Sequence, residues 1–132
     1  MRYVEGDRLA PPEYRLLRAA AGWSDPPLDD AALSDALATT WNVTARADDD
    51  TLVGMGRVQD DGLYASIWDM IVLPDQRGQG IGGELFERML RRCRGRSLVA
   101  LVATPFGAPM YRAAGFSEQS RGSIALFLRD VQ

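Results

Sequence analysis

Apolar and polar residues alternate along this chain with two different periods, and these periods predict its helices and strands. Apolar residues spaced three or four apart indicate helices, whereas strict alternation indicates strands. The pattern predicts one helix opened by Pro11 and ended by Gly22, and others over 31–40, 83–94 and 109–114. It predicts strands over 2–5, 41–47, 51–59, 63–74 and 97–104, followed by a hairpin of 116–119 and 123–129.

The order of these elements predicts a mixed α/β (α+β) fold. The Asp60-Asp61-Gly62 turn favours antiparallel neighbours on either side of it. Strand 63–74, helix 83–94 and strand 97–104 form a βαβ unit, whose two strands run parallel. Residues 97–104 are apolar almost without interruption, which favours a central strand covered on both faces. We therefore predict a single domain over 1–132, with a mixed, mostly antiparallel sheet around a central βαβ unit.

Composition narrows the chemistry that this chain can perform. The 132 residues include no histidine, which removes Ser-His and Cys-His nucleophilic catalysis, imidazole bases and most zinc sites. Catalysis must then use carboxylates, tyrosine, backbone dipoles or a borrowed cofactor, and we expect no metal. The net charge of −3 argues against a nucleic-acid partner. No apolar run approaches the ~18 residues of a membrane span, so we expect no membrane partner.

The chain has a single cysteine, Cys93, which cannot form an internal disulfide. A reducing cytoplasm is therefore the expected location. Cys93 falls on the apolar side of the predicted 83–94 helix, where a buried structural thiol is a better expectation than a reactive one.

A glycine-rich stretch, DQRGQGIGG over 75–83, follows the apolar strand 63–74. Its Gly78-x-Gly80-x-x-Gly83 spacing matches a dinucleotide fingerprint, but four strands precede it and no acidic residue ends the next strand. A Walker P-loop is excluded because no Gly-Lys-Ser/Thr follows. A plain turn would not need so many glycines, since each costs backbone entropy. Glycines between a strand and a helix N-terminus, beside Arg77, favour a pyrophosphate cradle.

Two separate motifs resemble the GNAT superfamily of acetyl-CoA-dependent N-acetyltransferases. The stretch Arg77-Gly78-Gln79-Gly80-Ile81-Gly82 is similar to that family's R/Q-x-x-G-x-G/A signature. The segment Met110-Tyr111-Arg112-Ala113-Ala114-Gly115-Phe116 is similar to its F-Y-x-x-x-G-F segment. The gap between the two accommodates one helix and one strand, as the family requires. The resemblance covers about 40–128.

The resemblance implies direct acetyl transfer from acetyl-CoA to a primary amine, without an acyl-enzyme. Strand 63–74 would separate from strand 97–104, and the pantetheine arm would lie in the gap. The backbone of Ile71, Val72 and Leu73 would then contact the pantetheine, and one of their N–H groups would face the thioester carbonyl. The N–H groups of the cradle would hold the pyrophosphate, and they belong to residues Arg77, Gly78, Gln79, Gly80, Ile81 and Gly82.

Two side chains are candidates for proton transfer. Tyr111 stands where the family's general acid stands, and a phenol with an ordinary pKa of ~10 is protonated at neutral pH. Its alternative is an aromatic ring packed under the last hairpin. Asp69 is an acidic residue inside an apolar strand, where burial would raise its pKa toward that of a general base. A structural Asp69 that accepts hydrogen bonds from a neighbouring segment is equally compatible with the sequence.

The chain departs from the family pattern near Tyr111. Many members carry an asparagine seven residues before the tyrosine, where this chain has Thr104, whose hydroxyl is the candidate coenzyme contact. Many also carry alanine where this chain has Gly107. These changes put the local geometry around Tyr111 in doubt.

The sequence gives only general expectations for the acceptor substrate and the oligomeric state. Acceptor choice in the family depends on the N-terminal helical region, here around Trp23, the 24–30 loop and Trp68. The expected acceptor is a small-molecule amine, with a peptide or protein N-terminus as the other substrate class. A non-catalytic acyl-CoA-binding module is the alternative function, because a fold alone does not establish activity. A homodimer is the family's common habit.

Overall fold

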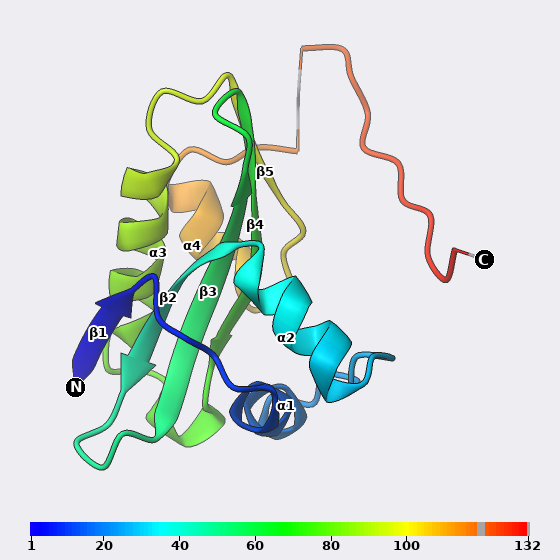
Figure 1. Ribbon diagram of the computed structural model, residues 1–132. Helices are drawn as coiled ribbons and strands as arrows, with labels where there is room; N and C mark the ends of the chain where they lie inside the picture. The colour runs from blue at the N-terminus through cyan, green and yellow to red at the C-terminus, as the bar shows by residue number, and fades with distance from the viewer. Residues whose placement is uncertain (119–120, 132) are drawn as a thin grey trace. The chain divides into compact units, whose positions relative to one another are not determined.

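The computed structural model describes residues 1–118 and 121–131. These belong to two compact units, Met1–Val102 and Ala103–Gln132. The first unit contains one sheet of five strands in the order β1-β2-β3-β4-β5 (Figure 1). β1 to β4 pair antiparallel and β4 pairs parallel with β5. The strands are β1 (Arg2–Glu5), β2 (Trp41–Arg46), β3 (Leu52–Asp60), β4 (Tyr64–Val72) and β5 (Leu98–Leu101).

Helices cover both faces of this sheet. α1 (Pro11–Ala20) and α2 (Asp30–Ala38) lie on one face, and α3 (Ile81–Arg92) lies on the other (Figure 1). A short 3₁₀ turn, η1 (Pro74–Gln76), separates β4 from α3. The core under α1 and α2 contains Leu9, Tyr14, Leu17, Leu33, Leu37, Leu52, Met55 and Ile71. The mixed α/β fold, the antiparallel neighbours and the β4-α3-β5 unit confirm the sequence predictions.

The start of α3 and the position of β5 in the sheet differ from the sequence predictions. α3 begins at Ile81, two residues before the predicted 83, because Gly80 adopts the N-cap position with a left-handed φ of 83°. The prediction of a central strand over 97–104 is wrong for the described residues, where β5 pairs only with β4. Leu98 is 53% exposed. A continuous apolar run marks a strand but does not specify which neighbours cover it.

The C-terminal unit contains α4 (Ala108–Ala113), close to the predicted 109–114. The predicted hairpin of 116–119 and 123–129 is not formed in the described residues, where only Ser123 makes an isolated bridge. Residue 119 lies outside the described part of the chain. The large apolar side chains after Ser123 are exposed, namely Ile124, Leu126, Phe127, Leu128 and Val131. Alternation favours an extended conformation, but it does not supply a partner strand.

None of the helices in 1–118 and 121–131 combines the length and apolarity that crossing a membrane requires. Within the same ranges, no group of three or more His, Cys, Asp or Glu side chains is arranged to hold a metal ion.

α3 packs closely on β3 because β3 carries glycine where the helix crosses it. A Cβ at Gly54 would lie 3.1 Å from Leu85 Cδ1 and 3.2 Å from the Ile71 carbonyl oxygen. A Cβ at Gly56 would lie 2.4 Å from Met89 Sδ. The two glycines therefore set the distance between the sheet and α3, whose N-terminus follows the glycine-rich stretch.

We expect Gly56→Ala to destabilise the protein. The added methyl overlaps Met89, and overpacking of this kind typically costs about 1–3 kcal/mol. Urea unfolding would measure the change. Gly83→Ala is the matched control, because a Cβ there meets no described atom within 4 Å and alanine favours a helix by up to about 1 kcal/mol. Equal or higher stability of Gly56→Ala would contradict the close packing of α3.

Candidate functional site

The parallel pairing of β4 with β5 stops partway along β4. The paired residues run from Tyr64 with Leu98 to Ile67 with Leu101, and β5 ends there. β4 continues to Val72. The last five residues of β4 therefore have a strand partner only on the β3 side within the described part of the chain. This agrees with the separation of the two strands expected from the sequence, and it leaves backbone N–H and C=O groups on an open edge.

Backbone geometry decides which N–H group faces this open edge. The N–H of Leu73 donates to the carbonyl of Val53, 2.9 Å away, on the β3 side. Successive residues of a strand direct their N–H groups to opposite sides, so Ile71 shares the direction of Leu73, and Val72 faces the other way. Ile71 also pairs with Met55 of β3. Of the three residues expected along the pantetheine, Val72 is thus the one whose N–H faces the open edge.

The glycine-rich stretch joins this edge to the N-terminus of α3. Gly78 and Gly80 adopt left-handed conformations, with φ of 80° and 83°, which other residues rarely tolerate. The first intrahelical bond of α3 runs from the Glu84 N–H to the Gly80 carbonyl at 3.1 Å. The N–H groups of residues 81–83 therefore have no acceptor within the helix. They carry the positive end of the helix dipole.

The described atoms leave open space around the glycines of this turn. A Cβ built at Gly78, Gly80 or Gly83 would meet no described atom within 4 Å. At Gly82 it would meet only Val72 Cγ2, at 3.7 Å. Since the glycines add no side chain there, an anion can approach the backbone directly. Gln79 and Ile81 belong to the same turn, and Ile81 is buried and anchors the helix.

Arg77 links the cradle to the open edge. Its Nε donates to the Val72 carbonyl oxygen at 3.2 Å. The guanidinium therefore lies along the same edge as the Val72 N–H and adds a full positive charge beside the N-terminus of α3. The structure thus brings Val72, Arg77 and the glycines together in the N-terminal unit.

Asp69 lies at an irregularity in β4. Met55 pairs with Ile71 and Arg57 with Trp68, so two residues of β4, Asp69 and Met70, stand opposite Gly56 alone. Asp69 has a φ of 56°, which is unusual for a residue other than glycine. This arrangement is a β-bulge, which bends its strand and increases the local twist. The bulge lies within the part of β4 that β5 does not pair, directly before Ile71 and Val72.

The Asp69 carboxylate accepts hydrogen bonds from three side chains. Arg57 Nε donates to Oδ2 at 2.8 Å, and the Tyr14 hydroxyl donates to the same oxygen at 2.5 Å. Arg18 Nη1 donates to Oδ1 at 3.2 Å. The Asp69 side chain is only 9% exposed. Sequence reasoning missed Tyr14, Arg18 and Arg57 as partners. An arginine inside the apolar strand 51–59 was the one available signal, because a buried charge requires a counter-charge.

In the C-terminal unit, Tyr111 is on α4. Its carbonyl accepts the Phe116 N–H at 3.1 Å, and its ring meets the Phe116 ring edge-on with centroids 6.1 Å apart. Burial raises the pKa of the Tyr111 phenol above its ordinary value of 10.0. The phenol is therefore protonated at neutral pH, as a general acid requires.

Thr104 and Gly107, the two departures from the family pattern, both act at the start of α4. The Thr104 hydroxyl accepts the Gly107 N–H at 3.2 Å, so it has a role in the turn before the helix. A Cβ at Gly107 would lie 3.3 Å from Tyr111 Cε2. Glycine at this position therefore leaves room for the Tyr111 ring.

Comparisons with known proteins agree with this geometry. The sequence pattern of the Acetyltransferase (GNAT) family matches residues 8–116. The chain is 37% identical over 78 residues to GCN5-related N-acetyltransferase 3, chloroplastic, of Arabidopsis thaliana, and this match covers 57% of this chain and 33% of that protein. The chain thus matches about a third of the length of that relative.

Two solved structures have the same fold. A probable acetyltransferase of Staphylococcus aureus superposes with a TM-score of 0.79 at 26% identity, over 97% of this chain and 99% of that one. A predicted acetyltransferase of Clostridium acetobutylicum, solved with acetyl-CoA, superposes with a TM-score of 0.70 over 96% of this chain and 95% of that one. At 19% sequence identity, this similarity establishes a shared fold and nothing about function.

Proposed function

This chain belongs to the Acetyltransferase (GNAT) family, and we propose that it transfers the acetyl group of acetyl-CoA directly to a primary amine of a small molecule. The observation that carries the proposal is the open edge of β4, where the Val72 N–H faces away from β3 directly before the glycine cradle. An extended amide-containing arm can hydrogen-bond to such an edge in the manner of an added strand.

The cradle supports acetyl-CoA as the acetyl donor. The N–H groups at the start of α3, together with Arg77, suit the pyrophosphate of coenzyme A. Acetyl-CoA supplies an activated acetyl group as a thioester. The Val72 N–H donates to the thioester carbonyl oxygen and stabilises the negative charge that develops there when the amine attacks.

The transfer needs no acyl-enzyme. The free amine nitrogen forms a bond to the acetyl carbon and gives up a proton to solvent, the carbon–sulfur bond breaks, and Tyr111 donates its phenolic proton to the departing thiolate and regains a proton from solvent. Cys93 does not act as a nucleophile, because it is 4% exposed and burial raises its thiol pKa. Asp69, the candidate base, has both oxygens engaged by three donors, so we assign removal of the ammonium proton to water.

Release of free thiol from acetyl-CoA, followed with a panel of amines, tests this proposal. The panel contains polyamines, arylalkylamines, aminoglycosides and short peptides with free N-termini, so that the two acceptor classes are separated. Turnover with a small amine is the expected result. Turnover with peptides alone would reassign the acceptor. Coenzyme A binding without turnover of any amine would instead support the non-catalytic binding module.

We expect Tyr111→Phe to lower kcat by about a hundredfold, because loss of a general acid typically costs 10²–10⁴-fold. The measurement is thiol release with the best amine of the panel. Phe116→Leu is a control that changes the ring packed against Tyr111 and leaves the phenol in place. An unchanged rate for Tyr111→Phe would exclude the phenol as the acid.

A further inference from the structure

Side chains from two other elements of the N-terminal unit contact the β4 bulge. Tyr14 and Arg18 come from α1, and Arg57 comes from β3. All three side chains donate to the Asp69 carboxylate. We call these four residues the Asp69 cluster. The cluster therefore fastens one residue of the sheet to a helix and to the neighbouring strand.

The guanidinium groups of the cluster lie over nearby aromatic rings, which restricts their movement. The Arg18 guanidinium carbon lies 5.4 Å from the Trp23 ring centroid and 5.6 Å from that of Tyr14. The Arg57 guanidinium carbon lies 6.0 Å from the Tyr14 ring centroid. All three distances are within the range of a cation–π interaction. Arg57 Nη1 also donates to Thr40 Oγ1 at 3.2 Å, just before β2.

Tyr14 is fixed as a donor in this arrangement. Burial, followed by its hydrogen bond to Asp69, raises the pKa of Tyr14 to about 12. The hydroxyl therefore keeps its proton at neutral pH and continues to donate. Two arginines and one carboxylate leave the cluster with one excess positive charge, so neutral replacement of Asp69 would leave both guanidinium groups without their carboxylate.

The backbone at Asp69 explains why such a cluster is needed. A φ of 56° is uncommon for a residue other than glycine, and inside a strand it departs from the extended conformation of its neighbours, so surrounding contacts are needed to hold it there. Only Met70 and Ile71 lie between Asp69 and Val72, whose N–H faces the open edge. A change of conformation at Asp69 would therefore redirect the edge on which acetyl transfer is proposed to depend.

We propose that Asp69 is a positioning residue which, together with Tyr14, Arg18 and Arg57, holds the left-handed bulge of β4 and thereby sets the direction of the Val72 edge. The expected change in kcat/KM rests on the proposed function. The expected change in coenzyme A affinity can be measured without turnover. A general base at Asp69 makes different predictions, and the two roles can be separated.

Three replacements of Asp69 separate positioning from proton abstraction. Asparagine tolerates the left-handed conformation and keeps a side-chain acceptor, glycine tolerates the conformation alone, and alanine keeps neither. We expect kcat/KM to fall least for Asp69→Asn and most for Asp69→Ala, with Asp69→Ala about fivefold below Asp69→Gly. The pH profile should keep its shape. A base would instead give equal losses of about a hundredfold or more in all three, with the acidic limb of the pH profile removed.

Variants of the partner side chains test the cluster with Asp69 intact. Arg57→Met should raise the coenzyme A dissociation constant and lower kcat/KM by about tenfold, while Arg57→Lys should recover part of both, because it restores the charge without the planar fork. Tyr14→Phe removes one donor and keeps the aromatic ring beside Arg18 and Arg57. Unaltered coenzyme A affinity and turnover in a folded Arg57→Met variant would overturn the proposal.

Asp50 supplies the matched control. It also has a left-handed backbone, with a φ of 69°, but it lies in the turn between β2 and β3. The same three replacements at Asp50 should change the melting temperature without changing coenzyme A affinity. If the wild type fails to acetylate any amine, calorimetry with coenzyme A still ranks the Asp69 variants. Equal affinities across that series would reject the positioning role independently of the proposed function.

Discussion

Gly80→Glu should abolish measurable binding of coenzyme A. Gly80 is the N-cap of α3 with a φ of 83°, and its missing Cβ leaves open the space beside the first N–H groups of the helix. Glutamate would place a carboxylate in this space, where it repels the pyrophosphate and competes for the same N–H donors. Calorimetric titration with coenzyme A measures the effect directly.

Gly95→Glu is a closely matched control for Gly80→Glu. Gly95 follows the other end of α3, has a φ of 80°, and a Cβ there also meets no described atom within 4 Å. Both variants therefore introduce the same charge and similar backbone strain, and both should lose a similar amount of stability. Coenzyme A should still bind Gly95→Glu. Loss of binding in both variants, or in neither, would show that the phosphate does not lie at the N-terminus of α3.

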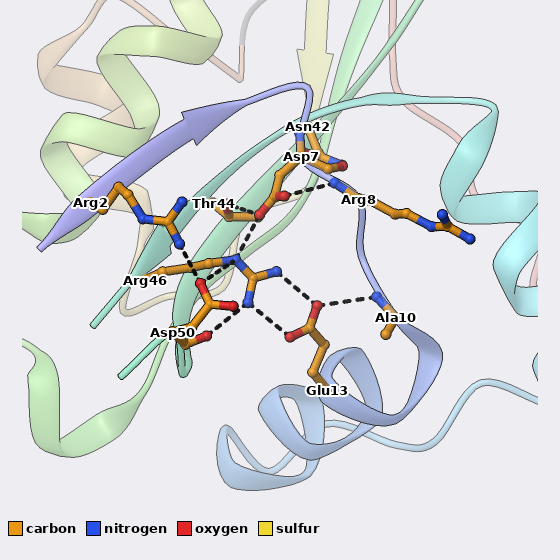
Figure 2. Close-up of polar contacts among 9 residues, drawn as sticks. All are labelled: Arg2, Asp7, Arg8, Ala10, Glu13, Asn42, Thr44, Arg46 and Asp50. Atoms are coloured by element: carbon orange, nitrogen blue, oxygen red, sulfur yellow. Dashed lines mark hydrogen bonds and ion pairs between the residues drawn. The ribbon is translucent and has the colours of Figure 1, made fainter. Parts of the chain in front are cut away.

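Arg46→Met should have the largest effect on stability. Arg46 is 6% exposed and lies at the centre of the polar contacts in Figure 2. Its Nε donates to Asp7 at 2.7 Å, and its two Nη atoms donate to Glu13 at 2.9 and 2.8 Å. Its Nη1 also donates to the Asp50 carbonyl at 3.0 Å. The guanidinium thereby joins β2 to the loop before α1, to α1 itself and to the β2–β3 turn.

Removing this guanidinium leaves two carboxylates without their counter-charge. Loss of one partner from a buried ion pair typically costs about 3–5 kcal/mol, and the partial exposure of Asp7 and Glu13 favours the lower end. Urea unfolding measures the change. Arg2→Met is the control, since Arg2 pairs with Asp50 at the surface with its side chain 61% exposed and should lose no more than about 1 kcal/mol. Similar losses in both variants would contradict a special role for Arg46.

The same contacts predict a dependence of stability on pH. Burial acts to raise the pKa of Asp7, but hydrogen bonds from Thr44 and Arg46 outweigh it and lower the pKa below 3.8. The hydrogen bond from Arg46 lowers the pKa of Glu13 below 4.5. A carboxyl whose pKa is lower in the folded state stabilises the protein above its unfolded pKa, and this stabilisation is lost as pH falls through the folded pKa. The stability difference between wild type and Arg46→Met should therefore be full at pH 7 and shrink below about pH 4.

Amino-acid sequence alone predicted most of the helices and strands and the glycine-rich turn before α3, because these features depend on local rules. Apolar periodicity marks a helix or strand wherever it occurs, and glycines between a strand and a helix leave backbone N–H groups accessible in almost any fold. The βαβ order around Gly80 followed from the same local signals. The start of α3 was missed by two residues because a left-handed Gly80 can serve as an N-cap without a side-chain acceptor.

Tertiary structure decided what the isolated charges do. Asp69 reads as a buried acid in the sequence, whereas its partners Tyr14, Arg18 and Arg57 come from positions 12 to 55 residues away. Arg46 gave no signal in the sequence, and its partner Glu13 is 33 residues away. Which N–H group faces the open edge of β4 could likewise be read only from the hydrogen bond between Leu73 and Val53. Burial and partnership of a charge depend on which distant segments the fold brings together, and no local period encodes that information.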